Sequence, residues 1–193
     1  QISKRWRDRQ LRYSWLCSMM GNYDDFWQLT IRALDATLEE HSLSSDQKIR
    51  ERLLSLYSEL KAYEEVPEVL ASLKASGHKL AVLSNASPRM LKTAIKAAGI
   101  AEYFIELFSV DVLKCYTPTP SVYRLVTDTF NCVPSGVNFF SSNNWDVAGA
   151  SIFGFRTIWI NQVGVSWDKL PGKPDHIVKS ISEASNLIGS RIN

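Results

Sequence analysis

The sequence predicts an α/β protein in which a helical subdomain precedes a parallel sheet. Residues 1–62 show the apolar spacing of helices and no strand pattern. From residue 63 onward, short apolar runs alternate with amphipathic segments, as in a parallel sheet covered by helices. In the segment VNFFSSNNWDVAGA at residues 137–150, an apolar run leads through a polar turn into the start of a helix. We therefore expect a helical subdomain at residues 1–62 and an α/β domain at residues 63–193.

Length and composition describe an ordinary globular protein. The 193 residues suffice for one core with a small satellite, and the hydrophobic content is 45%. A net charge of +2 gives no strong attraction to nucleic acid or to an anionic membrane. No apolar run approaches the ~20 residues of a membrane helix, and no signal-peptide pattern opens the chain. The 3 widely spaced cysteines favour reduced thiols in the cytoplasm, and the scattered histidines show no metal-ligand spacing.

Three helices are expected in residues 1–62. The first covers about the first twenty residues, Asp24 or Asp25 can cap the second, and residues 44–46 offer a start for the third. Their apolar faces contain, in chain order, Ile2, Trp6, Tyr13, Leu16 and Met20, then Trp27, Ile31 and Leu34, and finally Ile49, Leu53, Leu54 and Tyr57.

The first of these helices carries a basic run that could suggest nucleic-acid binding. Its position on the helix favours a solvated surface instead. Arg7 differs from the other basic residues, because it projects about 100° from Trp6, on the side of Leu11 and Ser14. An arginine on this less charged face could serve an anionic substrate. The run consists of Lys4, Arg5, Arg7, Arg9 and Arg12.

Strands and helices are expected to alternate in residues 63–193. Proline in the first helical turn predicts helices that begin near Pro67, Pro88 and Pro120, and glycine predicts ends near Gly77 and Gly99. The strands are expected at residues 79–84, 105–110, 137–140, 157–160 and 176–178, with a last helix from Ser180.

Polar residues follow the expected strands. Parallel strands end at one edge of a sheet, so these residues are expected to meet there. Each residue alone is commonly a turn former, and Asp146 alone also fits a charge at a helix N-terminus. Together they favour an anion-binding site. The turn offers a single carboxylate after serines and asparagines, which disfavours a magnesium site. The residues are Ser84, Asn85, Asp111, those at 141–146, and Asn161.

These motifs resemble those of the type II L-2-haloacid dehalogenases of the haloacid dehalogenase superfamily. The resemblance extends over nearly the whole chain. It implies a Rossmann-like core, a helical cap, often a homodimer, and no metal or other cofactor. The matching motifs are WRDRQLRYSWL at residues 6–16, LSNASP at 83–88, SVD at 109–111, SVY at 121–123, SSNNWDVAGA at 141–150 and WIN at 159–161.

The resemblance also implies a reaction. In this family an aspartate displaces halide from C2 of a short 2-haloalkanoic acid with inversion, and water then hydrolyses the ester. At the matching position Arg7 would meet the leaving halide, on which negative charge develops. The other implied roles are substrate-carboxylate binding by Ser84 and Asn85, an apolar wall from Phe26 and Trp145, and ordering of the nucleophile and water by Ser141, Asn143, Asp146 and Tyr123.

The sequence departs from the family pattern in two places. The family nucleophile lies in a DxYGT segment on the first core strand, and no Asp of residues 1–62 sits in that context. We expect that strand to be missing from this chain. Thr117 stands where the family has a lysine. Lys114 is a poor substitute, because residues three apart in an extended chain face opposite sides.

These departures predict that the chain alone shows no dehalogenase turnover, and they keep two alternatives open. One is a non-catalytic family member that binds a small anion or forms a dimer, which Thr117 favours. The other, a phosphatase of the same superfamily, fits less well, since such enzymes carry more carboxylates at the turn of residues 141–146.

Overall fold

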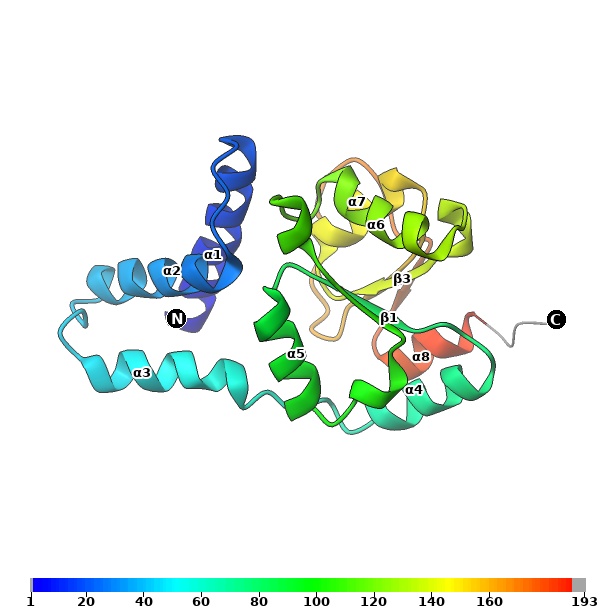
Figure 1. Ribbon diagram of the computed structural model, residues 1–193, viewed down its shortest axis with the longest axis horizontal. Helices are drawn as coiled ribbons and strands as arrows, with labels where there is room; N and C mark the ends of the chain where they lie inside the picture. The colour runs from blue at the N-terminus through cyan, green and yellow to red at the C-terminus, as the bar shows by residue number, and fades with distance from the viewer. Residues whose placement is uncertain (1, 189–193) are drawn as a thin grey trace. The chain divides into compact units, whose positions relative to one another are not determined.

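The computed structural model describes residues 2–188 and has the predicted alternation of helices and strands (Figure 1). The α/β class is thereby confirmed. The helical N-terminal region contains α1 (Ile2–Met19), α2 (Phe26–Glu40), α3 (Gln47–Ser55) and the short 3-10 helix Leu56–Ser58. The later helices are α4 (Val66–Ala75), α5 (Pro88–Ala97), α6 (Pro120–Phe130), α7 (Asn144–Phe153) and α8 (Ile181–Asn186). The strands are β1 (Ala81–Ser84), β2 (Glu106–Ser109), β3 (Asn138–Ser141), β4 (Arg156–Ile160) and β5 (His176–Val178).

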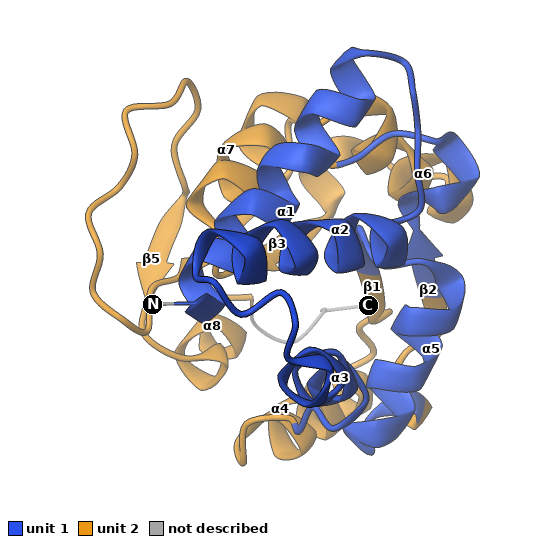
Figure 2. Ribbon diagram, turned by 90° about the vertical axis from the view of Figure 1, so that its left-hand side faces the viewer, with its two compact units in different colours: residues 1–61, 83–101, 107–116 blue, residues 62–82, 102–106, 117–193 orange. Residues whose placement is uncertain are grey.

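The chain divides into two compact units, coloured separately in Figure 2. The first unit comprises the chain up to Lys61 together with Leu83–Ala101 and Leu107–Tyr116. The second comprises Ala62–Val82, Glu102–Glu106 and the chain from Thr117 onward. The helices α1 to α3 therefore belong to the first unit, and α6, α7 and the strands β3 to β5 to the second.

The strands form two hydrogen-bonded sheets. One sheet has the order β1-β2 and the other the order β3-β4-β5. Both pairings of the second sheet are parallel, and Ser141 stands opposite Trp159 in its register. Within the described residues, no strand bonds to both β1 and β3, and for that reason the hydrogen-bond pattern splits there.

Local capping explains where the helices of the first unit begin. The Asp25 carboxylate accepts the N–H groups of Trp27 at 2.8 Å and Gln28 at 3.2 Å, so Asp25 caps α2. Asp46 caps α3 by accepting the Ile49 N–H at 3.0 Å. Both caps agree with the sequence prediction.

The predicted apolar faces of α1 and α2 meet only in part in the core of the first unit. The buried residues of α1 are Trp6, Gln10 and Ser14, whereas Leu16 and Met20 of the predicted face are 44% and 67% exposed. The side chains of Trp6, Ala33, Leu34 and Leu38 form a buried cluster there. Leu34 and Leu38 lie one turn apart on α2, as the helical period requires. Partly buried residues packed against this cluster are Tyr13, Leu43, Leu53, Leu54 and Tyr57.

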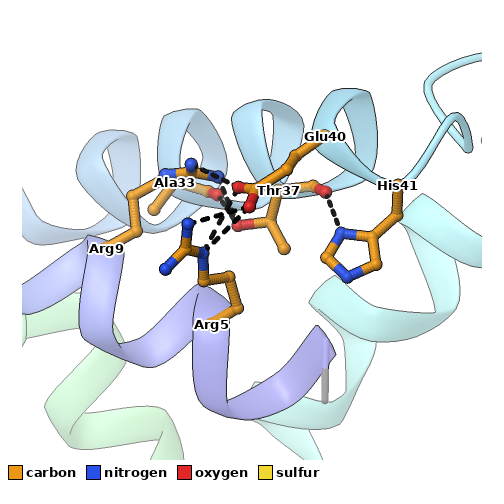
Figure 3. A network of polar contacts seen from close by, with 6 residues as sticks. All are labelled: Arg5, Arg9, Ala33, Thr37, Glu40 and His41. Carbon is orange, nitrogen blue, oxygen red and sulfur yellow. Dashed lines mark hydrogen bonds and ion pairs between the residues drawn. The ribbon is translucent and has the colours of Figure 1, made fainter.

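Two arginines of the basic run bind the C-terminal end of α2 (Figure 3). Arg5 and Arg9 both pair with Glu40, at N–O distances of 2.8 and 2.6 Å. Hydrogen bonds from Arg5 and Arg9 lower the pKa of Glu40 to about 2. Arg9 also donates to Thr37 Oγ1 at 3.0 Å. These contacts give Arg5 and Arg9 a role at the surface of the helix pair.

The second unit has its own core around the parallel strands. Ile158, Val178 and Ala184 form a buried cluster, against which Phe140, Ile160 and Ile188 pack. Glu65, which precedes α4, accepts a hydrogen bond from the Ile181 N–H at 3.3 Å and another from the Ser182 hydroxyl. These bonds attach the start of α8 to the start of α4. Across residues 2–188, the helices all fall short of the length and apolar character needed to cross a membrane.

Candidate functional site

The polar turn at residues 141–146 lies in the second unit, between β3 and α7. Strand β3 ends at Ser141, and Asn143 occupies the N-cap position of α7. The Ser141 hydroxyl accepts the Asn143 N–H at 3.1 Å, a contact that closes the turn directly after the strand. The expected strand, turn and helix start are therefore confirmed. The first turn of α7 carries Asp146.

Asp146 is the centre of a hydrogen-bonded network. Its Oδ1 accepts the Tyr123 hydroxyl at 2.8 Å, and its Oδ2 accepts the Ser141 hydroxyl at 3.2 Å. Burial raises the pKa of Asp146 to about 6, although both hydrogen bonds act to lower it. Burial and the neighbouring Asp146 raise the pKa of Tyr123, so its phenol stays protonated and serves as the donor. The structure thus brings together three predicted site residues from α6, β3 and α7.

Gly149 makes room for this network. A Cβ at Gly149 would lie 2.4 Å from Pro118 Cβ and 2.6 Å from the Tyr123 hydroxyl. Neither contact is sterically possible without a shift, so only glycine lets α7 approach the tyrosine this closely. Sequence reasoning interpreted Gly149 only as a small residue of a tightly packed helix. Its specific role depends on a neighbour from α6, which local patterns do not reveal.

Trp145 and Thr117 are the remaining predicted site residues of the second unit. Trp145 is half-buried in the first turn of α7, and Thr117 is only 5% exposed. Thr117 is joined to Pro118 by a cis peptide bond. Trp159 of β4 donates from its indole to the Ser142 carbonyl oxygen at 3.2 Å. This bond links the ends of β3 and β4, as expected for neighbouring parallel strands.

The first unit holds a second polar turn, at the end of β1. Ser84 ends the strand, and its hydroxyl accepts the Ala86 N–H at 3.1 Å. Ser109, at the end of β2, donates its hydroxyl to the Ala86 carbonyl oxygen at 2.7 Å. Asn85 lies within the turn and is half-buried. The bond from Ser109 joins the ends of β1 and β2, although Ser109 was not among the residues expected to meet there. The expected residue after β2, Asp111, accepts a hydrogen bond from Tyr23.

Arg7 and Phe26 are carried by the first two helices of the same unit. Arg7 is exposed on α1, and Phe26 is the first residue of α2. The Phe26 ring lies 5.8 Å from that of Tyr116, measured between centroids. Tyr116 is buried, and its backbone N–H donates to the Ser18 hydroxyl at 3.0 Å. No local sequence pattern predicts this contact with the tyrosine.

Lys114 has partners of its own in the first unit. Its Nζ lies 3.2 Å from Asp111 Oδ2 and 4.9 Å from the centroid of the Tyr23 ring. The Tyr23 hydroxyl also donates to Asp111, at 2.8 Å. Lys114 follows the 3-10 helix Val110–Leu113 and adopts a left-handed conformation. Asp111 is therefore engaged in binding the loop before α2.

The predicted site residues are thus shared between the two units. None of the His, Cys, Asp and Glu side chains in residues 2–188 gather in threes as a metal ion would require. The first unit carries Arg7, Phe26, Ser84 and Asn85, and the second carries Thr117, Tyr123, Ser141, Asn143, Trp145 and Asp146.

Comparison with known proteins identifies the family. The family model of haloacid dehalogenase-like hydrolases matches residues 6–154. The chain belongs to this family. Among its relatives, (S)-2-haloacid dehalogenase 1 of a Pseudomonas species (strain CBS-3) is 42% identical, over 97% of this chain and 83% of the relative. The (S)-2-haloacid dehalogenase 4A of Burkholderia cepacia is 40% identical, over 99% of this chain and 83% of the relative.

Solved structures agree with this assignment to the haloacid dehalogenase-like hydrolases. The L-2-haloacid dehalogenase of Xanthobacter autotrophicus, with chloropropionic acid covalently bound, superposes with a TM-score of 0.89 at 31% identity. That match covers 97% of this chain and 85% of the other. The resemblance to the type II L-2-haloacid dehalogenases is thereby confirmed. A phosphatase of the same superfamily from Thermococcus onnurineus, 18% identical with a TM-score of 0.64, shares the fold alone.

Proposed function

We propose that this chain carries the substrate-binding and water-ordering groups of an (S)-2-haloacid dehalogenase. The hydrogen-bonded set of Tyr123, Ser141 and Asp146 is the observation that carries the proposal. All three are residues that the family resemblance assigned to the ordering of nucleophile and water. The level of identity to curated (S)-2-haloacid dehalogenases, 42% in one case, supports the same substrate class.

The chemistry of Asp146 suits the hydrolytic step. With a pKa of about 6, its carboxylate is mostly ionised at neutral pH and is a stronger base than an exposed aspartate. It can accept a hydrogen bond from a water that attacks an ester. Tyr123 and Ser141 hold its two oxygens, so the orientation of the carboxylate is fixed before substrate arrives.

The polar residues at the end of β1 and the arginine on α1 suit an anionic substrate. The Ser84 hydroxyl accepts the Ala86 N–H, and its own proton is therefore available to donate to a carboxylate. Asn85 adds an amide donor in the same turn. The guanidinium of Arg7 would stabilise the charge that develops on the departing halide. Phe26 and Trp145 would supply the apolar wall. These assignments follow the family motifs residue by residue.

Chloride release from L-2-chloropropionate tests the proposal. We expect no release from the 193-residue chain, in which no aspartate matches the DxYGT nucleophile. The same chain extended at its N-terminus by a DxYGT strand should release chloride from the L enantiomer and not from the D enantiomer. Suppose that the lengthened chain folds but releases no chloride, even with Thr117→Lys. That result would contradict the proposed function and favour a non-catalytic anion-binding role.

Further proposals concern organisation and location. We propose residues 1–62 as a cap over a core formed by residues 63–193, a homodimer in solution, and a cytoplasmic location. The resemblance supports the cap and the dimer, and the odd number and wide spacing of the 3 cysteines support a reducing compartment. Light scattering of the purified chain tests the dimer directly, because a monomer mass would contradict it.

A further inference from the structure

Tyr57 joins all three N-terminal helical segments of the first unit. It lies in the short 3-10 helix Leu56–Ser58, which follows α3. Its ring meets those of Trp6 and Trp27 edge-on, at centroid distances of 5.5 and 5.9 Å. Its hydroxyl accepts the Gln10 side-chain amide at 3.1 Å. One side chain therefore contacts α1, α2 and the segment after α3.

Gln10 and Thr30 continue this contact as a buried polar network. Gln10 is 2% exposed and Thr30 0%, and the Gln10 amide donates to Thr30 Oγ1. The Trp6 indole donates to the Thr30 carbonyl oxygen at 2.8 Å. A buried amide is costly unless its groups are paired, and here the side-chain NH2 group donates to both Thr30 and Tyr57. Directional bonds of this kind fix one register between α1 and α2, whereas apolar packing tolerates several.

Arg7 lies beside this network. It follows Trp6 directly and precedes Gln10 by three residues, so the helical period places Arg7 and Gln10 next to one another. Burial raises the pKa of Tyr57, and the positive charge of Arg7 opposes that rise. Since α1 turns by about 100° per residue, a change of register would redirect Arg7 completely.

Phe26 is connected to the same network through its backbone. The Thr30 hydroxyl donates to the Phe26 carbonyl oxygen at 2.6 Å. Thr30 thus accepts from Gln10 of α1 and donates to the first residue of α2. Thr30 is therefore bonded to Phe26 of α2 and to Gln10 of α1, and Gln10 lies one helical turn from Arg7.

We propose that Gln10, Thr30 and Tyr57 are positioning residues, which hold Arg7 and Phe26 in the orientation that meets the halogen of the substrate. This inference rests on the proposed function for the role of Arg7. It adds that a buried hydrogen-bond network between α1 and α2 sets the orientation of the Arg7 side chain, together with the residues that adjoin Arg7.

Thr30→Val and Thr37→Val form a matched pair for the test. Both threonines are 0% exposed on α2, and both donate to the carbonyl oxygen four residues earlier, at 2.6 Å for Thr30 and 2.7 Å for Thr37. Each accepts one N–H from α1. Thr30 accepts it from Gln10, and Thr37 accepts it from Arg9, as Figure 3 shows for Thr37. Valine keeps the shape and removes the hydroxyl. Only Thr30 is connected to Tyr57.

The probe is bromide, titrated into the 193-residue chain while the side-chain Nε–Hε signal of Arg7 is followed by NMR. Arg7→Lys assigns that signal. We expect Thr30→Val to weaken the apparent bromide affinity roughly three- to tenfold, the effect of one buried hydrogen bond, and Thr37→Val to leave it within about twofold. Equal effects of the two variants, or no effect of Thr30→Val, would overturn the proposal.

A second readout separates this inference from the proposed function. If bromide does not move the Arg7 signal in the unsubstituted chain, the halide role of Arg7 fails. The positioning claim is then decided by the signal without bromide, which Thr30→Val should shift or broaden and Thr37→Val should not. An Arg7 signal unchanged in both variants contradicts positioning. Should Thr30→Val fail to fold, Gln10→Met removes the same α1 donor and takes its place.

Discussion

The Tyr123 hydroxyl lies 2.8 Å from Oδ1 of Asp146 and 3.1 Å from the carbonyl oxygen of the same residue. One phenol therefore holds both the side chain and the backbone of Asp146 at the first turn of α7. The aromatic rings of Phe139, Phe153 and Phe155 surround Tyr123 at centroid distances of 5.8 to 5.9 Å. This apolar setting fixes the ring, and it also explains why the carboxylate beside it is hard to ionise.

Tyr123→Phe should raise the pKa of Asp146 further. The hydrogen bond from Tyr123 lowers that pKa, so its removal leaves burial less opposed. We also expect a loss of about 1–2 kcal/mol in the free energy of unfolding, as for a buried hydrogen bond. Carboxyl ¹³C NMR titration measures the pKa. Tyr63→Phe is the control, because Tyr63 is 68% exposed and the change there should alter neither quantity.

The contribution of Asp146 to the free energy of unfolding should fall as the pH rises from about 4 to 6. The pKa of Asp146 is raised to about 6 in the folded state, against about 3.9 in the unfolded chain. Between these values the folded state binds more protons, so a rise in pH favours unfolding. Asp146→Asn should reduce this decline by roughly 2–3 kcal/mol over the interval.

Urea unfolding at several pH values measures that slope. Asp111→Asn serves as the opposite case. The hydrogen bond from Tyr23 lowers the pKa of Asp111, so its contribution is present above the unfolded pKa and is lost as the pH falls below about 4. An Asp146→Asn variant with the wild-type slope between pH 4 and 6 would show that Asp146 ionises normally.

Gly149→Ala should destabilise the protein by about 1–3 kcal/mol and disturb Tyr123. The added methyl group would lie 2.4 Å from Pro118 and 2.6 Å from the Tyr123 hydroxyl, so α7 or the tyrosine must move. Gly136→Ala is the control, because the nearest atom to a Cβ there is 3.9 Å away. Urea unfolding gives the stability, and near-UV circular dichroism reports the tyrosine environment. Similar losses in both variants would contradict the steric argument.

Thr117→Lys should restore the charge of the family lysine at a cost in stability. Thr117 is 5% exposed, and an ammonium there is expected to cost roughly 1–3 kcal/mol when no carboxylate faces it. The penalty should shrink above about pH 9, because burial lowers a lysine pKa and neutralisation removes the cost. Thr117→Met, similar in length and uncharged, separates size from charge. In the chain extended by DxYGT, only the lysine variant should gain chloride release, by roughly 100-fold or more.

The candidate site was partly readable from the sequence. The turn at residues 141–146 and the polar residues after β1 follow from local patterns, because an apolar run followed by serines and asparagines predicts a strand end. The roles of Phe26 and Tyr123 came only from the resemblance to a family, whereas Arg7 also stood out by its position on a less charged helix face. The clearance at Gly149 and the Gln10–Thr30–Tyr57 network left no such signal, since each depends on residues distant in sequence.

By itself the sequence determined the α/β class, the order of helices and strands, and the family. Those properties follow from apolar periodicity, caps and short motifs, which act over a few residues. The tertiary structure alone decided that Tyr123 and Ser141 share the carboxylate of Asp146, and that burial raises its pKa. A pKa and a hydrogen-bond network depend on which distant groups exclude water from one place, and no local pattern encodes that.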